Sequence, residues 1–203
     1  MTIHGSHPFL PAEGDRDPLR RWRGRMPAPV SVWTATAGGR PQGWTVSSFV
    51  LADGRPGEVV GLVDEDSDLA DALRAGARFA VSLLGWRHRG LADVFAGLAP
   101  APGGLFTQGS WRDTDWGPVL ADGAGWLGAR LLDQPDRAVE EQPGRQARDP
   151  QASRQPEPAS RPDHAGWALL VRGVVEHLEP GELPPEGVLC SFRGRYSAIG
   201  ATT

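Results

Sequence analysis

The pattern of apolar and polar positions predicts β-strands along most of the first half of the chain. Residues 30–35 alternate between the two kinds and are rich in β-branched and aromatic side chains, which favour strands. The glycine pair at 38–39 predicts a turn into a second strand over 43–51. The apolar runs 58–63 and 79–84 predict two further strands, the first of them buried.

Helical spacing is confined to short segments between these strands. In 17–22 an N-cap aspartate precedes a proline at the first helical position, which predicts a short helix. Ser67 or Asp68 can cap a second helix over 69–75, and 89–95 carries apolar residues at helical spacing. The fold class that follows is mostly β with short helices.

The second half of the chain predicts three more strands, over 125–132, 167–178 and 188–192. Together with the earlier strands they would give a sheet of six or seven. The chain has eight tryptophans, an unusual aromatic set. Most of these we expect in the core or a subunit interface, and the alternative is a planar ligand stacked on one or two of them.

Composition divides the chain into one domain and two segments without a core pattern. Between 134 and 162 there are six prolines and a single large aliphatic residue, Val139. Such a stretch cannot bury enough apolar area to offset its ordering entropy, so we expect a disordered insertion in a surface loop. Residues 1–14 lack periodicity and are expected to form a disordered N-terminal tail, which leaves 15–200 as a single domain.

Charge and cysteine content exclude several classes of protein. The 21 cations are all arginine, so lysine chemistry such as a Schiff base is excluded, and the net charge of −4 gives no basic surface for nucleic acid or an anionic membrane. Cys190 is the only cysteine, which rules out an intrachain disulfide and favours a cytoplasmic protein. No apolar run is long enough for a signal peptide or a membrane span.

Three short motifs have simpler explanations than a catalytic or metal site. Residues 123–128 match G-x-G-x-x-G but lack the preceding strand and long following helix of a dinucleotide site. The acidic run 64–68 begins like a calcium loop but lacks its sixth-position glycine and twelfth-position glutamate. The five histidines show no metal-ligand spacing, and Cys190 lies in an apolar strand where a core thiol is expected. The catalytic residues therefore stay unassigned.

The order of the segments resembles the flavin reductase-like family, whose members are FMN-binding split barrels. That family has a Val-rich strand, a G-x-T-x-[SN]-S-F strand, an aliphatic strand, a short helix, an F-A-V-N strand, a helix ending near F-A-G, and a C-terminal R-G-R-Y. The segments of this chain that match, in the same order, are 30–34, 43–49, 59–63, 69–75, 79–84, 95–97 and 193–196.

The resemblance implies a homodimeric β-barrel that binds FMN in a cleft near the subunit interface and reduces it with NADH or NADPH. Reduced flavin would then pass to a partner monooxygenase. By position in the family pattern, the strand residues Trp44, Thr45, Val46, Ser47 and Ser48 would contact the flavin. Two further residues carry over in the same way: Ser67 would face the phosphate, and Ser82 replaces the usual asparagine.

Three departures from the family pattern keep other functions open, and the replacement of asparagine by Ser82 is one of them. The turn at 64–66 carries three acidic residues where a phosphate is expected, and Asp163-His164 lies four residues farther from Gly173 than the family's G-D-H does from its strand glycine. The main alternative is a split barrel that binds flavin or another planar ligand without reducing it. A pure interaction protein, acting through its proline-rich segment, is a third possibility.

Overall fold

The computed structural model describes residues 18–132 and 163–200. The predicted tail, 1–14, and the predicted insertion, 134–162, lie outside these residues. Most of the described chain forms one eight-stranded antiparallel sheet. Its strands are β2 (Ser31–Ala37), β3 (Arg40–Val46), β4 (Phe49–Ala52), β5 (Glu58–Asp64), β6 (Phe79–Leu83), β9 (Trp126–Leu131), β10 (His164–Ala165) and β11 (Ala168–Glu179).

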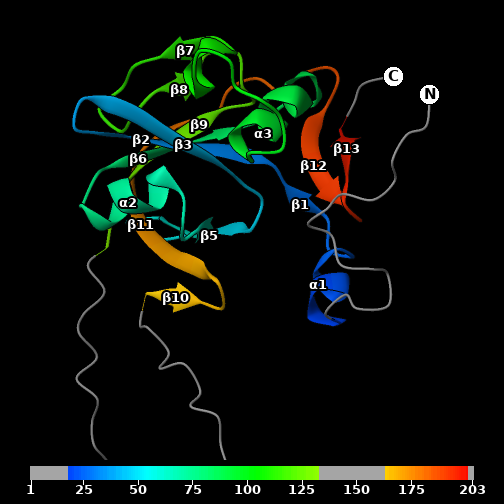
Figure 1. Cartoon of the computed structure of the whole chain (residues 1–203), viewed down its shortest axis with the longest axis horizontal. Helices are drawn as coiled ribbons and strands as arrows, with labels where there is room; N and C mark the ends of the chain where they lie inside the picture. The colour runs from blue at the N-terminus through cyan, green and yellow to red at the C-terminus, as the bar shows by residue number, and fades with distance from the viewer. Residues whose placement is uncertain (1–17, 133–162, 201–203) are drawn as a thin grey trace, which may run out of the picture.

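The order of strands in this sheet shows why it curls into a barrel. The order is β3-β2-β6-β9-β11-β5-β4, with β10 paired to β11. Strands β3 and β4 therefore lie at opposite ends of the order, yet only Ser47 and Ser48 separate them in the chain. Two residues span at most about 7 Å, so the two edges must come together. The curled sheet is visible in Figure 1, and it confirms the predicted mostly-β split barrel.

The prediction of one continuous strand over 43–51 is wrong. The strand ends at Val46 because β3 pairs with β2, whereas β4 begins at Phe49 because it pairs with β5. The chain leaves one edge of the sheet and joins the other at Ser47–Ser48, so these two residues form the seam of the barrel.

Within 18–132 and 163–200, five further strands lie outside the main sheet. The predicted strand 188–192 forms, but as β12 (Val188–Phe192) of a separate three-stranded sheet rather than as part of the barrel sheet. Its partners are β1 (Ala28–Pro29) and β13 (Arg195–Ile199), while β7 (Trp111–Arg112) pairs with β8 (Val119–Leu120). The estimate of six or seven strands in one sheet was thus too low for the barrel and missed the smaller sheets.

The helices form close to their predicted positions. They are α1 (Pro18–Arg23), α2 (Asp68–Arg74) and α3 (Arg89–Phe95), with 3-10 turns at Trp86–His88 and Leu105–Thr107. Helices α2 and α3 lie on opposite sides of β2 and β3, and α1 lies apart from the barrel (Figure 1). No helix within 18–132 or 163–200 is long and apolar enough to cross a membrane.

Alternate residues of β2 contribute to two apolar cores. Val32 packs in the core beneath α3, and its neighbour Trp33 packs in the core beneath α2. Trp33 is fully buried and stacks on Phe79, with ring centroids 5.2 Å apart. Gly61 of β5 makes room for this indole, because a Cβ there would lie 2.7 Å from Cζ2 of Trp33. The position of β5 in the barrel wall therefore depends on a glycine.

Candidate functional site

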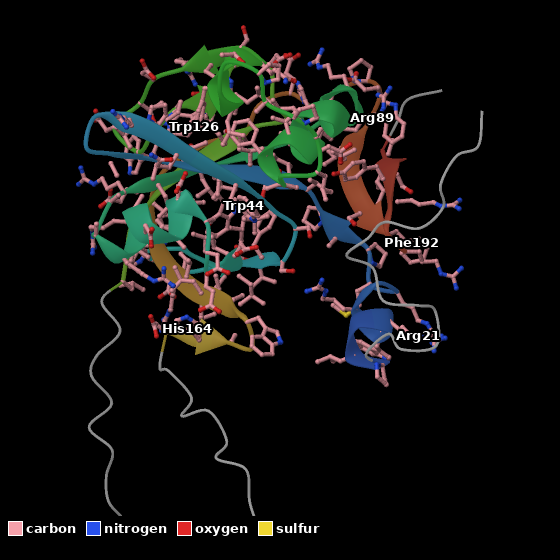
Figure 2. The ribbon with its side chains drawn as sticks, viewed as in Figure 1. Arg21, Trp44, Arg89, Trp126, His164 and Phe192 are labelled. Carbon is pink, nitrogen blue, oxygen red and sulfur yellow. The ribbon has the colours of Figure 1, made fainter. Side chains whose placement is uncertain are left out.

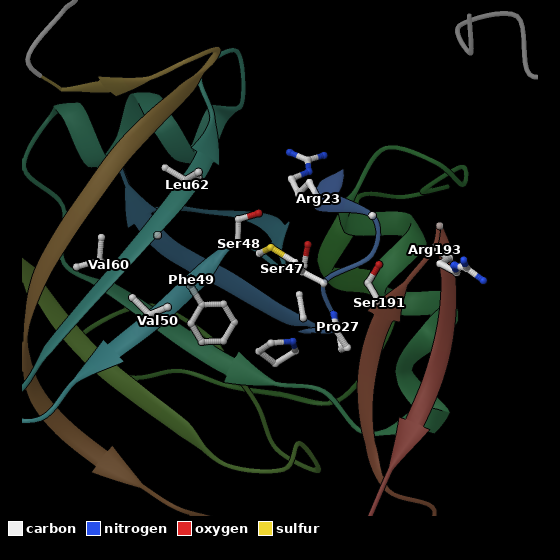
Figure 3. A pocket seen from close by; sticks show the side chains of 16 residues that line it. Arg23, Pro27, Ser47, Ser48, Phe49, Val50, Val60, Leu62, Ser191 and Arg193 are labelled. Carbon is white, nitrogen blue, oxygen red and sulfur yellow. The ribbon is translucent and has the colours of Figure 1, made fainter. Parts of the chain in front are cut away.

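A groove of about 750 Å³ opens at the seam of the barrel. One side is formed by β4, β5 and Ser47–Ser48, and the other by the chain after α1 and the turn between β12 and β13 (Figure 3). Its volume lies within the range of about 300–1,000 Å³ that is usual for small-molecule sites. The topology that closes the barrel thus also creates this groove.

The barrel side of the groove is apolar. Because side chains alternate along a strand, Val60 and Leu62 of β5 face the groove while Val59 and Val63 are buried in the core. Val50 of β4, the ladder partner of Val60, is 63% exposed beside them. Figure 3 shows these side chains together on one wall. Such a surface suits the face of a planar ring.

The opposite side of the groove is lined by Arg23, Ser191 and Arg193. The guanidinium of Arg193 lies over the ring of Phe192, 5.7 Å from its centroid, and points away from the apolar wall (Figure 3). Arg193 and Gly194 both have positive φ, at 53° and 71°, which is the backbone of a two-residue type I′ turn between β12 and β13. The N–H of Arg193 donates to the carbonyl oxygen of Gly24 at 2.7 Å. This bond ties the turn to the chain that follows α1.

Ser47 and Ser48 are the predicted site residues that line the groove. Both side chains are partly exposed, and neither hydroxyl has a hydrogen-bond partner within 18–132 and 163–200. The carbonyl oxygen of Ser48 accepts the N–H of Leu62 at 2.9 Å, which holds the seam against β5. The two hydroxyls are therefore free to bond a ligand.

The three predicted residues on β3 lie on either face of that strand and outside the groove lining. Thr45 faces α3, where its hydroxyl donates to the carbonyl oxygen of Ala92 at 2.8 Å. Val46 is buried in the core beneath α2, and Trp44 packs against the same core (Figure 2). Their predicted contacts with a flavin stay predictions.

Ser67 and Ser82 are buried and use their hydroxyls internally. The hydroxyl of Ser67 donates to the carbonyl oxygen of Asp64 at 2.7 Å and accepts the N–H of Ala70 at 3.1 Å, which makes Ser67 the N-cap of α2. The hydroxyl of Ser82 accepts the N–H of Leu120 at 3.1 Å and joins β6 to β8. Neither residue lines the groove, so their predicted roles at a flavin also stay predictions.

The acidic turn after β5 is joined to the hairpin formed by β10 and β11. His164, only 10% exposed, lies with Nε2 2.9 Å from Oε2 of Glu65 and Nδ1 2.9 Å from Oδ1 of Asp163 (Figure 2). The hydrogen bond from His164 holds the pKa of the Asp163 carboxyl below its ordinary value. At the end of the hairpin, Trp167 is 91% exposed. The longer spacing between Asp163-His164 and Gly173, compared with the family pattern, is therefore occupied by this hairpin.

Comparison with protein families identifies the fold group of the chain. Residues 23–200 match the model of the flavin reductase like domain, which is most of the sequence. The chain belongs to the flavin reductase-like family. Among curated proteins, none matches this flavin reductase-like chain.

Solved structures with the same fold include three named flavin reductases or oxidoreductases. Flavin reductase PheA2 is 18% identical, with a TM-score of 0.67 over 90% of this chain and 96% of its own. The NADH:FAD oxidoreductase SgcE6 of Streptomyces globisporus C-1027 is 23% identical, with a TM-score of 0.67 over 94% and 97%. Flavin reductase HpaC, solved with NADP+, is 17% identical, with a TM-score of 0.66 over 91% and 97%. At these identities the likeness shows the fold.

Most of the groove lining was not predicted from the sequence. Residues 193–196 match a family segment, but no role was predicted for Arg193 or for Arg23. One signal was available for Arg193, because an Arg-Gly pair between two strands is a candidate two-residue turn that exposes its first side chain. Nothing in the sequence indicates that this turn lies beside the end of α1.

Proposed function

We propose that this protein is an NAD(P)H-dependent flavin reductase that takes FMN as its flavin. The observation that carries the proposal is the groove at the barrel seam, in a chain that matches the flavin reductase like domain over 23–200. The nicotinamide would supply a hydride and the flavin would accept it, so the chemistry belongs to the two cofactors. The residues of the chain would bind and orient them.

The groove fits a flavin in size and in the kind of side chains that line it. The apolar wall formed by Val50, Val60 and Leu62 can cover one face of the ring system and exclude water from it. The free hydroxyls of Ser47 and Ser48 can donate to polar atoms at the edge of the ring or along the ribityl chain. No catalytic acid or base is required of the groove residues, since hydride transfer is between cofactors.

Two further parts of the proposal concern partners. A homodimer is supported by β4, which is an end strand of the barrel sheet and whose Leu51, outside the groove lining, is 56% exposed. An exposed apolar edge strand of this kind can pair with or be covered by another chain. The second part is that the protein releases reduced flavin to a flavin-dependent monooxygenase in the cytoplasm.

One observation favours the alternative of a barrel that binds flavin without reducing it. Both ring nitrogens of His164 are within 2.9 Å of carboxylates, so this histidine is engaged in the protein rather than free toward a nicotinamide. The alternative thus differs from the main proposal in the nicotinamide step and agrees with it on the flavin site.

Anaerobic titration of FMN separates these functions. We expect the protein to bind FMN and to accelerate its bleaching by NADH or NADPH relative to buffer. Leu62→Arg, which places a charge on the apolar wall, should weaken binding, whereas the matched control Leu183→Arg lies at a 73% exposed position outside the groove and should not. Binding without faster bleaching would select the alternative, and failure to bind FMN would refute both.

A further inference from the structure

We propose that a second copy of this chain docks across the groove, with its acidic turn against an arginine patch beside α1. The arginine patch consists of Arg21, Arg23, Arg25, Arg193 and Arg195. The acidic turn consists of Asp64, Asp66 and Asp68. The inference rests on the homodimer of the proposed function and adds the charged side chains that hold the two copies together.

The arginine patch is one surface built from both ends of the described chain. The N–H of Arg193 donates to the carbonyl oxygen of Gly24 at 2.7 Å, and Ala28 of β1 pairs with Ser191 of β12. These contacts hold the chain after α1 beside the β12–β13 turn. All five arginines are exposed, and none makes an ion pair with a residue in 18–132 or 163–200. The patch is therefore a positive surface that an anionic partner can neutralise.

Large apolar side chains are exposed among these arginines. Trp22 is 61% exposed, Met26 is 50% exposed and Phe192 is 36% exposed. Figure 2 shows Phe192 and Arg21 on the side of the molecule where α1 and β12 lie. Tryptophan, phenylalanine, methionine and arginine are enriched at contacts between proteins. The composition of the patch thus favours a protein as its partner.

The acidic turn begins at the end of the opposite wall of the groove. Because side chains alternate along a strand, Val60, Leu62 and Asp64 share one face of β5. Asp64, Asp66 and Asp68 are exposed, and none makes an ion pair within the described ranges. The groove therefore has unpaired cations along one side and unpaired anions at the end of the other.

This arrangement is complementary to itself under a two-fold rotation. In a two-fold dimer both copies use the same surface, so each arginine patch meets the partner's acidic turn and the contact is made twice. Figure 3 shows Arg23 and Leu62 on opposite sides of the groove, which places the groove between the two charged surfaces. The end strand β4 lines the same groove through Val50 and is continuous with this surface.

Analytical ultracentrifugation of charge-reversed variants of the full chain tests the contact. We expect Arg25→Glu and Asp66→Arg each to weaken dimerisation at least about tenfold, because each places like charges together at both contacts. An equimolar mixture of the two variants should restore the dimer, since the new glutamate then faces the new arginine. The matched controls Arg40→Glu and Asp113→Arg change exposed charges outside both surfaces and should leave dimerisation unchanged. Added salt should weaken the wild-type dimer.

The outcomes distinguish this inference from the proposed flavin chemistry. A wild-type monomer that binds FMN, or a dimer that both charge reversals leave intact, would overturn the docking surface while the flavin site stands. Two monomeric variants that fail to pair when mixed would also overturn it, because their charges would not face each other. A dimer that behaves as expected but does not bind FMN would overturn the flavin proposal alone. Unfolding midpoints show whether each variant is folded, and Arg21→Glu replaces Arg25→Glu if the latter is not.

Discussion

The Nε2 atom of His164 lies 2.9 Å from Oε2 of Glu65, and this contact joins the β10–β11 hairpin to the turn that precedes α2. Helix α2 contributes to the same cluster, because Arg74 donates to the carbonyl oxygen of Glu65 at 3.0 Å and to Asp71 at 3.1 Å. On the other side of the imidazole lies Asp163. The ladder already pairs Ala168 of this hairpin with Asp64, and the cluster adds α2 to the same unit.

Acid sensitivity is the first prediction. His164 holds the pKa of Asp163 below its ordinary value of 3.8, and a group with a lowered folded pKa stabilises the protein above that value. The contribution is lost as the pH falls through the lowered pKa. We therefore expect wild-type stability to fall more steeply than that of Asp163→Asn as the pH is lowered from about 5 to 3. Urea unfolding at each pH measures this, with Asp53→Asn as an exposed control, and parallel curves for wild type and Asp163→Asn would contradict it.

Tyr196 provides a second prediction at high pH. Burial, followed by the hydrogen bond that its hydroxyl donates to Asp93 at 2.9 Å, raises the pKa of Tyr196 above 10.0. Stabilisation from a raised pKa is complete below the unfolded value and is lost as the pH rises above it. Because Tyr196 is the only tyrosine, the near-ultraviolet absorbance of tyrosinate reports this group alone. We expect no ionisation of the folded protein at pH 10, and Tyr196→Phe should cost about 1 kcal/mol.

An ordinary titration near pH 10.0 in the folded state would contradict the burial of the Tyr196 hydroxyl. Urea-unfolded protein is the control, since it should titrate at the usual pH. Loss of stability in Tyr196→Phe without a shifted titration would point to altered packing rather than to the bond with Asp93.

The close packing of Gly61 on Trp33 gives a third prediction. A methyl group at Gly61 would lie 2.7 Å from Cζ2 of Trp33 and 3.3 Å from Cβ of Phe49, so Gly61→Ala should cost about 1–3 kcal/mol of unfolding free energy. Gly90→Ala is the matched control, because a Cβ at this position in α3 has no neighbour within 4 Å. It should stabilise the protein by up to about 1 kcal/mol. Equal midpoints for the two variants would contradict the tight contact.

The neighbouring strands β9 and β11 lead to a fourth prediction. Leu131 pairs with Gly173, and the N–H of Leu132 donates to the carbonyl oxygen of Arg172 at 2.8 Å. The register of this pair is thus fixed within the described residues. Replacement of 134–162 by a Gly/Ser linker of about ten residues should change the unfolding free energy by less than about 1 kcal/mol. FMN affinity should stay unchanged, and a large loss of either would show that the replaced segment is structural.

The sequence was most informative where structure depends on neighbours in the chain. Helix α3 occupies 89–95 as its apolar spacing predicts, and Ser67 caps α2 as its side chain allows. The break at Ser47–Ser48 could not be predicted in this way, because 44–51 contains no glycine or proline that would mark a turn. What ends β3 there is its ladder partner, β2, and that pairing is set by the closure of the whole barrel.

The candidate site, like the fold, was predictable only where its residues are neighbours in the chain. The family pattern led to Ser47 and Ser48 because their motif is contiguous in the sequence. It did not lead to the wall formed by Arg23 and Arg193, since these residues lie near opposite ends of the chain. The two segments are brought together by the pairing of β1 with β12 and by the hydrogen bond from Arg193 to Gly24. Strand β12 was predicted over 188–192, but the two-residue β1 was not, and neither segment indicates its partner.

The two faces of β5 differ in how freely their residues can be substituted. Val59 and Val63 are buried in the core and Gly61 packs against Trp33, whereas Val60 and Leu62 are only partly buried and line the groove. Mutational tolerance along this strand should therefore alternate from one residue to the next. A library restricted to Val60 and Leu62 would explore new ligands while leaving the folded scaffold intact, so binding preference can evolve here faster than architecture.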